Sequence, residues 1–259
     1  MIIAVDIGNT NIVLGCTNDE NDKILFRERI ATNQTATDLE YAVSIRTALD
    51  MNGVDVSAID GAIISSVVPS VTNTVKAAIV KLTGVKVMVV GPGIKTGLSI
   101  LIDNPAQLGS DLVVDAVAGI QEYQAPMIII DMGTATTLSV IDAKKNYIGG
   151  VIMTGMAVST DALISRTAQL PKIAFEKPKK IIGTNTIDCL KSGIMYSNAC
   201  AIDGMVDRLE EELGEKCTVI ATGGLSGVVI PLCRREGIIL DDTLLLKGLM
   251  IIYNRNKRD

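Results

Sequence analysis

Two short segments of this sequence combine residue types that can bind a polyphosphate. The first is MIIAVDIGNTNIVLG (1–15) and the second is MIIIDMGTATTLSVI (127–141). In each, an apolar run ends in Asp-x-Gly and is followed by small hydroxyl or amide residues. Glycine lets the main chain approach an anion closely, so that backbone N–H groups reach phosphate oxygens. The strand-end carboxylate offers a hard oxygen to Mg²⁺. The pair of segments predicts two phosphate-binding hairpins.

The two segments align without gaps at an offset of 125 residues, close to half of the 259-residue chain. The aligned pairs are Asp6 with Asp131, Gly8 with Gly133, Asn9 with Thr134, and Asn11 with Thr136. A single copy would be weak evidence, because Asp and Gly are common in hairpins of every kind. A repeat at half the length indicates a duplicated domain, since solenoid repeats have much shorter periods.

A third segment, VIATGGLSG (219–227), reads as a buried strand that ends in Gly223-Gly224. Two glycines at this point would let a flat ring such as adenine lie against the backbone. A plain turn between a strand and a helix is compatible with the same residues. The chain has no GxxxxGK[ST] phosphate loop.

Composition excludes several classes of function. The chain has no histidine, so a Ser-His-Asp triad and an imidazole metal site are both ruled out. A net charge of −5 with only two Phe argues against nucleic-acid binding. The five scattered cysteines form no CxxC pair, which argues against a disulfide framework or a zinc site.

The apolar segments give no sign of a membrane protein. The apolar run at the N-terminus stops at Asp6 without a basic lead-in, and TLLLKGLMIIY (243–253) is short and is interrupted by Lys247. We therefore expect a cytoplasmic protein. The apolar segment around Leu249–Tyr253 is expected in a core, with an interface as the alternative.

Hydrophobic periodicity predicts the order β-β-β-α-β-α-β for residues 1–91. The second half repeats the pattern, with a third strand at 147–155, helices at 159–170 and 186–214, and a strand at 217–224. A helix over 105–123, with Asn104 as N-cap and Pro105 in its first turn, joins the halves. The prediction is an α/β protein of two domains, 1–118 and 119–259, with a ligand cleft between them.

At this level of detail the sequence resembles the type III pantothenate kinases, which belong to the actin-like (ribonuclease H-like) superfamily of sugar kinases and Hsp70. The resemblance runs through nearly the whole chain in family order. Its motifs are DIGNTN (6–11), DNPAQLGSD (103–111), DMGTATT (131–137), GGVIMTG (149–155), IGTNT (182–186), KSGIMY (191–196) and ATGG (221–224). It implies duplicated domains, each a mixed sheet flanked by helices.

The resemblance also implies an activity and a set of roles. The activity is ATP-dependent phosphorylation of pantothenate to 4′-phosphopantothenate, the first step of coenzyme A biosynthesis, by a homodimer with Mg²⁺ and a monovalent cation (K⁺ or NH₄⁺). Asp111 would be the general base. Asp6 would bind Mg²⁺ and Asp131 the monovalent cation. The phosphates would be bound by Gly8, Asn9, Thr10, Asn11, Gly133 and Thr134. Adenosine would lie at Gly223 and Gly224, and pantothenate at Gly109, Ser110 and Thr186.

The sequence departs from the family pattern around the acceptor. Leu112 replaces an arginine, Asp115 an asparagine and Thr154 a proline. An arginine suits a carboxylate such as that of pantothenate. Either another cation, such as Lys95 or Arg166, meets that carboxylate, or the chain is a diverged nucleotide-binding paralogue that acts on another small alcohol or is a non-catalytic regulator.

Overall fold

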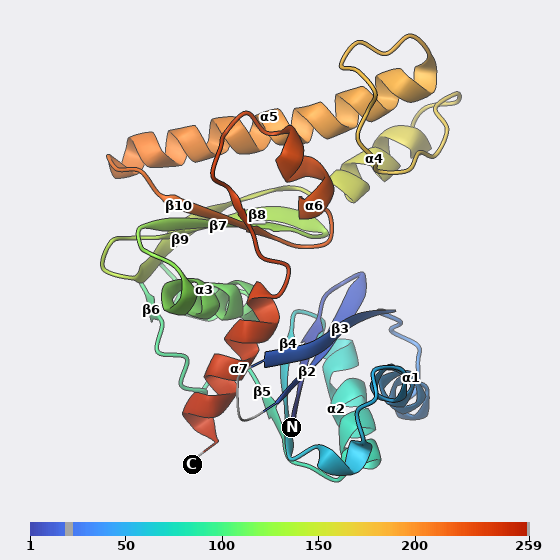
Figure 1. Cartoon of the computed structure of the whole chain (residues 1–259), viewed down its shortest axis with the longest axis vertical. Helices are drawn as coiled ribbons and strands as arrows, with labels where there is room; N and C mark the ends of the chain where they lie inside the picture. Colours follow the sequence, from blue (N-terminus) through green and yellow to red (C-terminus); the bar gives the residue numbers. More distant parts are fainter. Residues whose placement is uncertain (19–22, 258–259) are drawn as a thin grey trace. The chain divides into compact units, whose positions relative to one another are not determined.

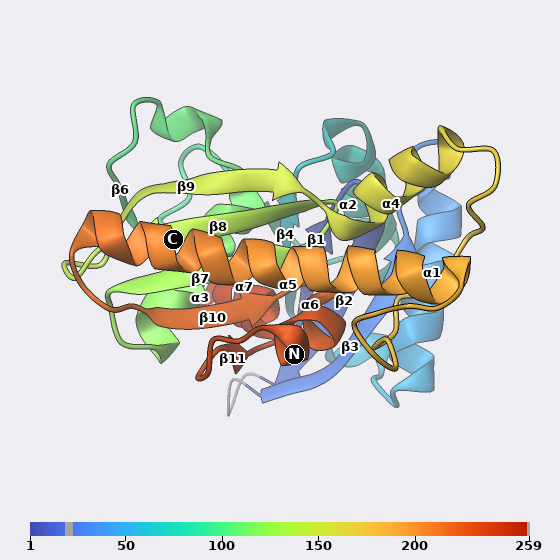
Figure 2. The same ribbon diagram turned by 90° about the horizontal axis from the view of Figure 1, so that it is seen from above.

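The computed structural model describes residues 1–18 and 23–257 (Figures 1 and 2). The chain divides into two compact units. Unit 1 comprises Met1–Leu98, Asp103–Glu122 and the residues from Thr243 onward, and unit 2 comprises Ser99–Ile102 and Tyr123–Asp242.

The sheet of unit 1 has five strands in the order β3-β2-β1-β4-β5. The strands are β1 (Ile2–Ile7), β2 (Asn11–Asn18), β3 (Lys23–Ala31), β4 (Gly61–Ser66) and β5 (Val87–Val89). β1 runs antiparallel to β2 and parallel to β4. The predicted order β-β-β-α-β-α-β is confirmed, and the sheet is mixed.

Helices cover both faces of this sheet (Figure 1). On one face, α1 (Asp38–Met51) and α2 (Pro69–Thr83) pack on alternate residues of β1 that include Ile3 and Val5. On the other face lies α7 (Leu244–Asn256). A Cβ on Gly15 of β2 would come within 2.6 Å of Leu246, which shows how closely α7 approaches the strands. A short 3₁₀ helix, η1 (Val56–Ala58), precedes β4.

The last helix belongs to unit 1, whereas the sequence pattern predicts that the whole of 119–259 forms a second domain. Its apolar side is buried, with Leu244, Leu249 and Ile252 fully covered. At Gly248 an added Cβ would overlap the Val114 carbonyl oxygen, so this glycine lets α7 pack tightly on α3. The apolar tail segment therefore has the predicted core role, but in the first unit.

The helix predicted over 105–123 is wrong at its start. Pro105–Gln107 form a separate 3₁₀ turn, η2, and α3 runs from Ser110 to Glu122. Asn104 does cap the turn, because its side chain accepts a hydrogen bond from the Ala106 N–H. Leu108 then adopts extended backbone angles, which ends the turn before α3 begins.

The sheet of unit 2 has six strands in the order β11-β10-β7-β8-β9-β6. They are β6 (Ser99–Ile100), β7 (Met127–Met132), β8 (Ala135–Ile141), β9 (Asn146–Thr154), β10 (Thr218–Thr222) and β11 (Ile239–Leu240). The long helix α5 (Thr186–Leu213) lies along one face of this sheet (Figure 2). Its buried residues pack on Ile128 and Ile130 of β7 in the core of unit 2.

The remaining helices of unit 2 are short. They are α4 (Met156–Ser165), α6 (Ser226–Val229) and the 3₁₀ helix η3 (Ile230–Leu232). The helix predicted over 159–170 starts and ends earlier than expected, because Gly155 takes the N-cap position and Arg166 the C-cap. Within the described residues, no helix combines the length and apolar character needed to cross a membrane.

Candidate active site

The first hairpin joins β1 to β2, and its turn is held on both sides. Across the turn, the Gly8 N–H donates to the Asn11 carbonyl at 3.0 Å. From the end of β3, Thr32 donates its hydroxyl to the Gly8 carbonyl at 2.6 Å and its N–H to the Thr10 carbonyl at 3.0 Å. The side chains of Asn9, Thr10 and Asn11 are exposed. The turn is thus fixed by hydrogen bonds to its main-chain carbonyls, while its side chains are open to a ligand.

The segment that contains Asp111 meets this hairpin at one edge of the sheet. β1 and β4 are parallel, with Asp6 opposite Ser65, and the Val67 N–H continues the ladder by donating to the Ile7 carbonyl at 3.1 Å. α3 begins at the same edge, where the Ser110 hydroxyl lies 3.0 Å from that of Ser65. Carboxyl ends of parallel strands are the usual ligand-binding edge of such sheets. Unit 1 therefore brings together Asp6, the first turn and residues 109–111.

Asp111 is the second residue of α3 and is partly buried. Its Oδ1 accepts a hydrogen bond from the Leu112 N–H at 2.8 Å. Burial raises the pKa of the Asp111 carboxyl above its ordinary value of 3.8, and the hydrogen bonds from the Leu112 and Asp111 amides oppose this shift without cancelling it. A raised pKa favours uptake of a proton, which is what a general base must do.

Gly109 leaves space for the Asp111 carboxylate in the position that it occupies. A Cβ at this position would overlap Asp111 Oδ1, at a separation closer than real atoms approach. The glycine leaves room for the side chain of Asp111, so the Gly-x-Asp pattern has a steric reason.

The second hairpin joins β7 to β8 in unit 2. Its Gly133 N–H donates to the Ala135 carbonyl at 3.0 Å, as Gly8 does to Asn11 in the first hairpin. The second turn is one residue shorter, since Met132 pairs with Thr136 where Ile7 pairs with Ile12. The ungapped alignment of Asn11 with Thr136 is therefore wrong, and the repeat slips by one residue after the turn.

Asp131 lies in a row of polar residues that crosses three strands. It is opposite Thr137 on β8 and opposite Thr222 on β10. Thr222 is buried, at 5% exposed, whereas Asp131 and Thr137 are partly buried. Residues paired across neighbouring strands present their side chains on the same face. The carboxylate of Asp131 is therefore flanked by two threonines.

Gly223 packs directly against this row. It has φ +91°, and a Cβ here would overlap Asp131 Oδ1 and lie 2.5 Å from the Met132 nitrogen. The Ser226 hydroxyl donates to the Gly223 carbonyl at 2.8 Å, which fixes the turn before α6, while Gly224 is exposed. Both glycine turns of unit 2 thus lie at the end of β7.

Gly155, the N-cap residue of α4, packs against the main chain of the second turn. A Cβ on Gly155 would overlap the Thr134 carbonyl oxygen and lie 2.6 Å from that of Gly133. Gly155→Ala must therefore displace the turn, and we expect it to weaken ATP binding by at least about tenfold if the turn holds phosphate, because misplaced N–H groups lose charge-assisted hydrogen bonds. Isothermal titration with an ATP analogue measures the change.

The matched control for this substitution is Gly204→Ala. Gly204 lies inside α5, where an added methyl group would meet no side chain of the described residues within 4 Å. This substitution should leave ATP binding unchanged and raise helix stability by up to about 1 kcal/mol. Equal nucleotide affinity in Gly155→Ala and the wild type would remove the second turn from the phosphate site.

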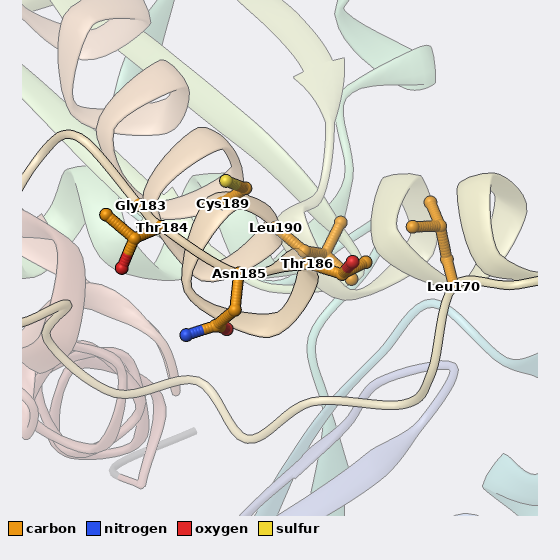
Figure 3. A pocket seen from close by; sticks show the side chains of 7 residues that line it. All are labelled: Leu170, Gly183, Thr184, Asn185, Thr186, Cys189 and Leu190. Carbon is orange, nitrogen blue, oxygen red and sulfur yellow. The ribbon is translucent and has the colours of Figure 1, made fainter.

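Thr186 occupies a different part of unit 2. It is the first residue of α5 and lines an open pocket of about 600 Å³ (Figure 3). The other lining residues are Leu170, Gly183, Thr184, Asn185, Cys189 and Leu190. Asn185 caps the helix by accepting a hydrogen bond from the Asp188 N–H at 2.9 Å. The pocket walls therefore come from the segment before α5 and from its first turn.

Several residues of the site are not predicted by the sequence pattern. Ser65 and Ser66 anchor α3, and Gly155 supports the second turn. A usable signal exists for the serines, because they interrupt the buried apolar run GAIISSVV (61–68). For Gly155 the signal is its place at the end of the motif GGVIMTG (149–155), but its role cannot be read from that motif, because it depends on a contact with a turn about twenty residues earlier in the chain.

Comparison with solved structures places the fold in the actin-like α/β class. The activator of the 2-hydroxyisocaproyl-CoA dehydratase from Clostridium difficile with bound ADPNP superposes with a TM-score of 0.59 at 15% identity, over 99% of this chain and 96% of that one. The ethanolamine utilization protein EutJ from Carboxydothermus hydrogenoformans gives a TM-score of 0.52 at 16% identity, over 96% and 88%. The predicted fold class is confirmed.

Sequence comparison then gives the family. The family model for type III pantothenate kinase matches residues 2–208. The type III pantothenate kinase of Halalkalibacterium halodurans is 44% identical over 257 residues, covering 99% of this chain and all of that protein. That of Moorella thermoacetica is 40% identical over 256 residues, with the same coverage. The chain belongs to the type III pantothenate kinase family, and it is a kinase that uses ATP and a small-molecule acceptor.

Proposed function

We propose that this chain transfers the γ-phosphoryl group of ATP to the hydroxyl of pantothenate, with Asp111 as general base. The products are ADP and 4′-phosphopantothenate, and the reaction is the first step of coenzyme A biosynthesis. The observation that carries the proposal is the anchoring of the Asp111 segment at the sheet edge that also bears the first hairpin. That arrangement occurs in a chain matched to the kinase family over residues 2–208.

In this proposal the nucleotide is held mainly by main-chain groups. The turn N–H groups of Asn9, Thr10 and Asn11, with that of Thr134, bind the phosphates. Gly8 and Gly133 close the two turns with their own N–H groups and leave room for the phosphates to approach. Gly223 and Gly224 leave room for adenosine. Each N–H to a charged oxygen contributes on the order of 1.5–3 kcal/mol. The fixed first turn supports this role, because its amides need no reorganisation when the phosphates bind.

Two carboxylates suit the cations of the reaction. Asp6 is the strand-end carboxylate that would hold Mg²⁺, an ion that commonly takes one or two carboxylates together with phosphate and water oxygens. When bound, Mg²⁺ would neutralise charge on the phosphates. Asp131 would hold the monovalent cation. Its neighbour Thr137 has a buried hydroxyl oxygen for which the described part of the chain supplies no hydrogen-bond partner, so an oxygen ligand is available there.

The pantothenate hydroxyl oxygen loses its proton as it gains the phosphoryl group. Asp111 accepts the proton of the pantothenate hydroxyl as its oxygen bonds to the γ-phosphorus, and the bond from that phosphorus to the β,γ-bridging oxygen breaks. Positioning supplies most of the acceleration in such reactions. Gly109, Ser110 and Thr186 would contact pantothenate. The exposed cations Lys95 and Arg166 are the candidates for its carboxylate, since Leu112 cannot bind it.

The test uses the purified chain with ATP, Mg²⁺, K⁺ and pantothenate, followed by mass detection of the product. We expect a species of the mass of phosphopantothenate, with ADP released in equal amount. If ADP is released only with another small alcohol, the acceptor is that alcohol and not pantothenate. Nucleotide binding without turnover on any acceptor would favour a regulatory protein.

The homodimer implied by the family resemblance and the cytoplasmic location expected from the sequence form part of the same proposal. Unit 2 leaves large apolar side chains exposed, with Ile152 at 76% and Ile182 at 74%, and substitution of either by a charged residue tests whether it lies in a contact between two copies. Light scattering on the purified chain measures its mass in solution against the 27.4 kDa of one copy.

A further inference from the structure

The hydroxyl of Ser110 lies where elements of unit 1 converge. It lies 3.0 Å from the Ser65 hydroxyl, accepts the Ser66 N–H at 3.1 Å and donates to the Ser66 carbonyl at 3.0 Å. Ser65 and Ser66 are the last two residues of β4, and Ser110 is the first residue of α3. One side-chain oxygen therefore joins the start of the helix to the end of the strand.

These contacts use the full hydrogen-bonding capacity of the hydroxyl. A serine hydroxyl has one proton to donate and two lone pairs that accept. The proton goes to the Ser66 carbonyl, so the Ser65 hydroxyl must act as donor to Ser110, and the Ser66 N–H fills the second lone pair. Ser65 is fully buried, which makes the loss of its partner costly. The Ser110 side chain has no capacity left for a substrate.

The strand end that receives Ser110 is itself held by α2. The Ser66 hydroxyl accepts hydrogen bonds from the Thr72 hydroxyl at 2.7 Å and from the Val68 N–H at 3.1 Å. The series of contacts thus runs from the first turn of α2, through the end of β4, to the first residue of α3. No member of the series is a flexible long side chain.

We infer that Ser110 is a positioning residue that fixes the first turn of α3, and with it Asp111, to the end of β4. The inference rests on the proposed role of Asp111 as general base. Asp111 follows Ser110 directly, and its carboxylate accepts a hydrogen bond from the amide of Leu112, the next residue of the same helix. Its location relative to the first hairpin therefore depends on how the helix start is tied to the sheet.

The same contacts revise the role expected for Ser110 at pantothenate. Its hydroxyl faces the sheet edge and is saturated, so any contact that residue 110 makes with the acceptor must come from its main chain. Loss of the hydroxyl should therefore affect the chemical step more than acceptor binding.

The first test is Ser110→Ala in steady-state kinetics. We expect kcat to fall about 10- to 100-fold, because a displacement of about 1 Å can cost a factor of about 100, while KM for pantothenate and for ATP changes less than about threefold. Unchanged kcat would overturn the inference. A rise in pantothenate KM with unchanged kcat would also overturn it, because that result would assign the hydroxyl to substrate binding.

A double-mutant comparison with Ser65→Ala tests whether the two hydroxyls act as one unit. Ser65→Ala keeps both contacts between Ser110 and the Ser66 main chain, so we expect a smaller loss of kcat. Ser65→Ala/Ser110→Ala should match Ser110→Ala within about twofold, whereas multiplied losses would show independent roles. Ser44→Ala is the matched control, because its hydroxyl donates to a carbonyl of its own helix, α1.

Hydrogen exchange separates this inference from the proposed function. Ser110→Ala should raise exchange of the Ser66 amide and of the first turn of α3 at least about tenfold and leave the peptides of unit 2 unchanged. This readout needs no turnover, so it applies even if the wild type does not phosphorylate pantothenate. Unchanged exchange in 61–68 and 108–114 would overturn the inference on its own.

Discussion

Replacement of Asp111 by asparagine should lower kcat by a factor on the order of 10² to 10⁴, the usual contribution of a general base. Asparagine keeps the size of the side chain and its hydrogen bond from the Leu112 N–H but cannot accept the proton of the hydroxyl. ATP binding should remain within about twofold of the wild type, since Asp111 is not in either glycine turn. Titration with an ATP analogue and steady-state kinetics measure the two quantities.

The stability of this variant separates chemistry from folding. Burial raises the pKa of Asp111, which means that the ionised form is disfavoured in the folded protein. At neutral pH the wild type holds an ionised carboxylate in a partly buried position, which costs free energy of folding. Asp111→Asn has no such charge, so it should unfold at the same temperature or higher. Asp50→Asn is the control, because Asp50 is an exposed carboxylate on α1 that pairs with Arg46 at 3.6 Å. It should retain full activity.

The pH dependence of kcat follows from the same shift. The base must be ionised, so activity falls as the pH drops through its pKa. Because burial raises the pKa of Asp111 above 3.8, the acid limb should lie at a higher pH than an exposed aspartate would give. Full activity of Asp111→Asn, or an acid limb that persists in it, would end the general-base assignment.

Replacement of Glu210 by alanine should destabilise unit 2 by about 1–3 kcal/mol, because it leaves the donors around a buried carboxylate without their acceptor. Glu210 is only 4% exposed near the end of α5. Its carboxylate accepts hydrogen bonds from the Cys217 N–H at 3.0 Å, from Lys216 at 2.7 Å and from the Arg235 guanidinium. Urea unfolding measures the change in stability, and hydrogen exchange of the α5 amides shows whether it is located in this helix.

The cluster also ties the segment after η3 to the helix. Arg235 pairs with Asp207 at 2.9 Å, and the Asp203 carboxylate accepts the Arg234 N–H at 2.8 Å. The neighbouring exposed residue Glu211 is the matched control, and Glu211→Ala should change stability by less than about 0.5 kcal/mol. A Glu210→Ala protein as stable as this control would show that the cluster adds nothing.

Acid should remove the same stabilisation. Burial alone would raise the pKa of Glu210, but the hydrogen bonds from Cys217, Lys216 and Arg235 and the charge of Arg235 outweigh it and lower the pKa to about 2. A carboxyl with a lowered pKa stabilises the fold above its unfolded value of about 4.5, and this contribution is lost as the pH falls from there toward 2. The wild type should therefore lose stability over that range, and Glu210→Ala should lose less.

The sequence predicts the fold well where the pattern is local. The apolar strands, the Asp-x-Gly turns and the helices of residues 1–91 follow from hydrophobic period and turn chemistry, and the structure has them. The domain boundary is harder, because the apolar face of α7 fits any core, and only tertiary contacts such as those of Gly248 with Val114 and of Leu246 with Gly15 show that it packs in unit 1.

The residues of the candidate site, too, are only partly predictable from the sequence. The residues that belong to motifs are found from the sequence, but the groups that hold them are not. Ser65 reaches Ser110 across 45 positions of sequence, and Gly155 reaches the second turn through a close approach of two backbones. Such contacts are set by tertiary packing, and no spacing rule reads them from one sequence.

The most direct measurement is a crystal structure of this chain with a non-hydrolysable ATP analogue and pantothenate. We predict that the phosphates lie against the turns at Gly8 and Gly133 and that the acceptor hydroxyl lies within about 2.6–3.2 Å of the Asp111 carboxylate. A nucleotide bound away from both turns, or an acceptor hydroxyl beyond reach of Asp111, would contradict the proposed function.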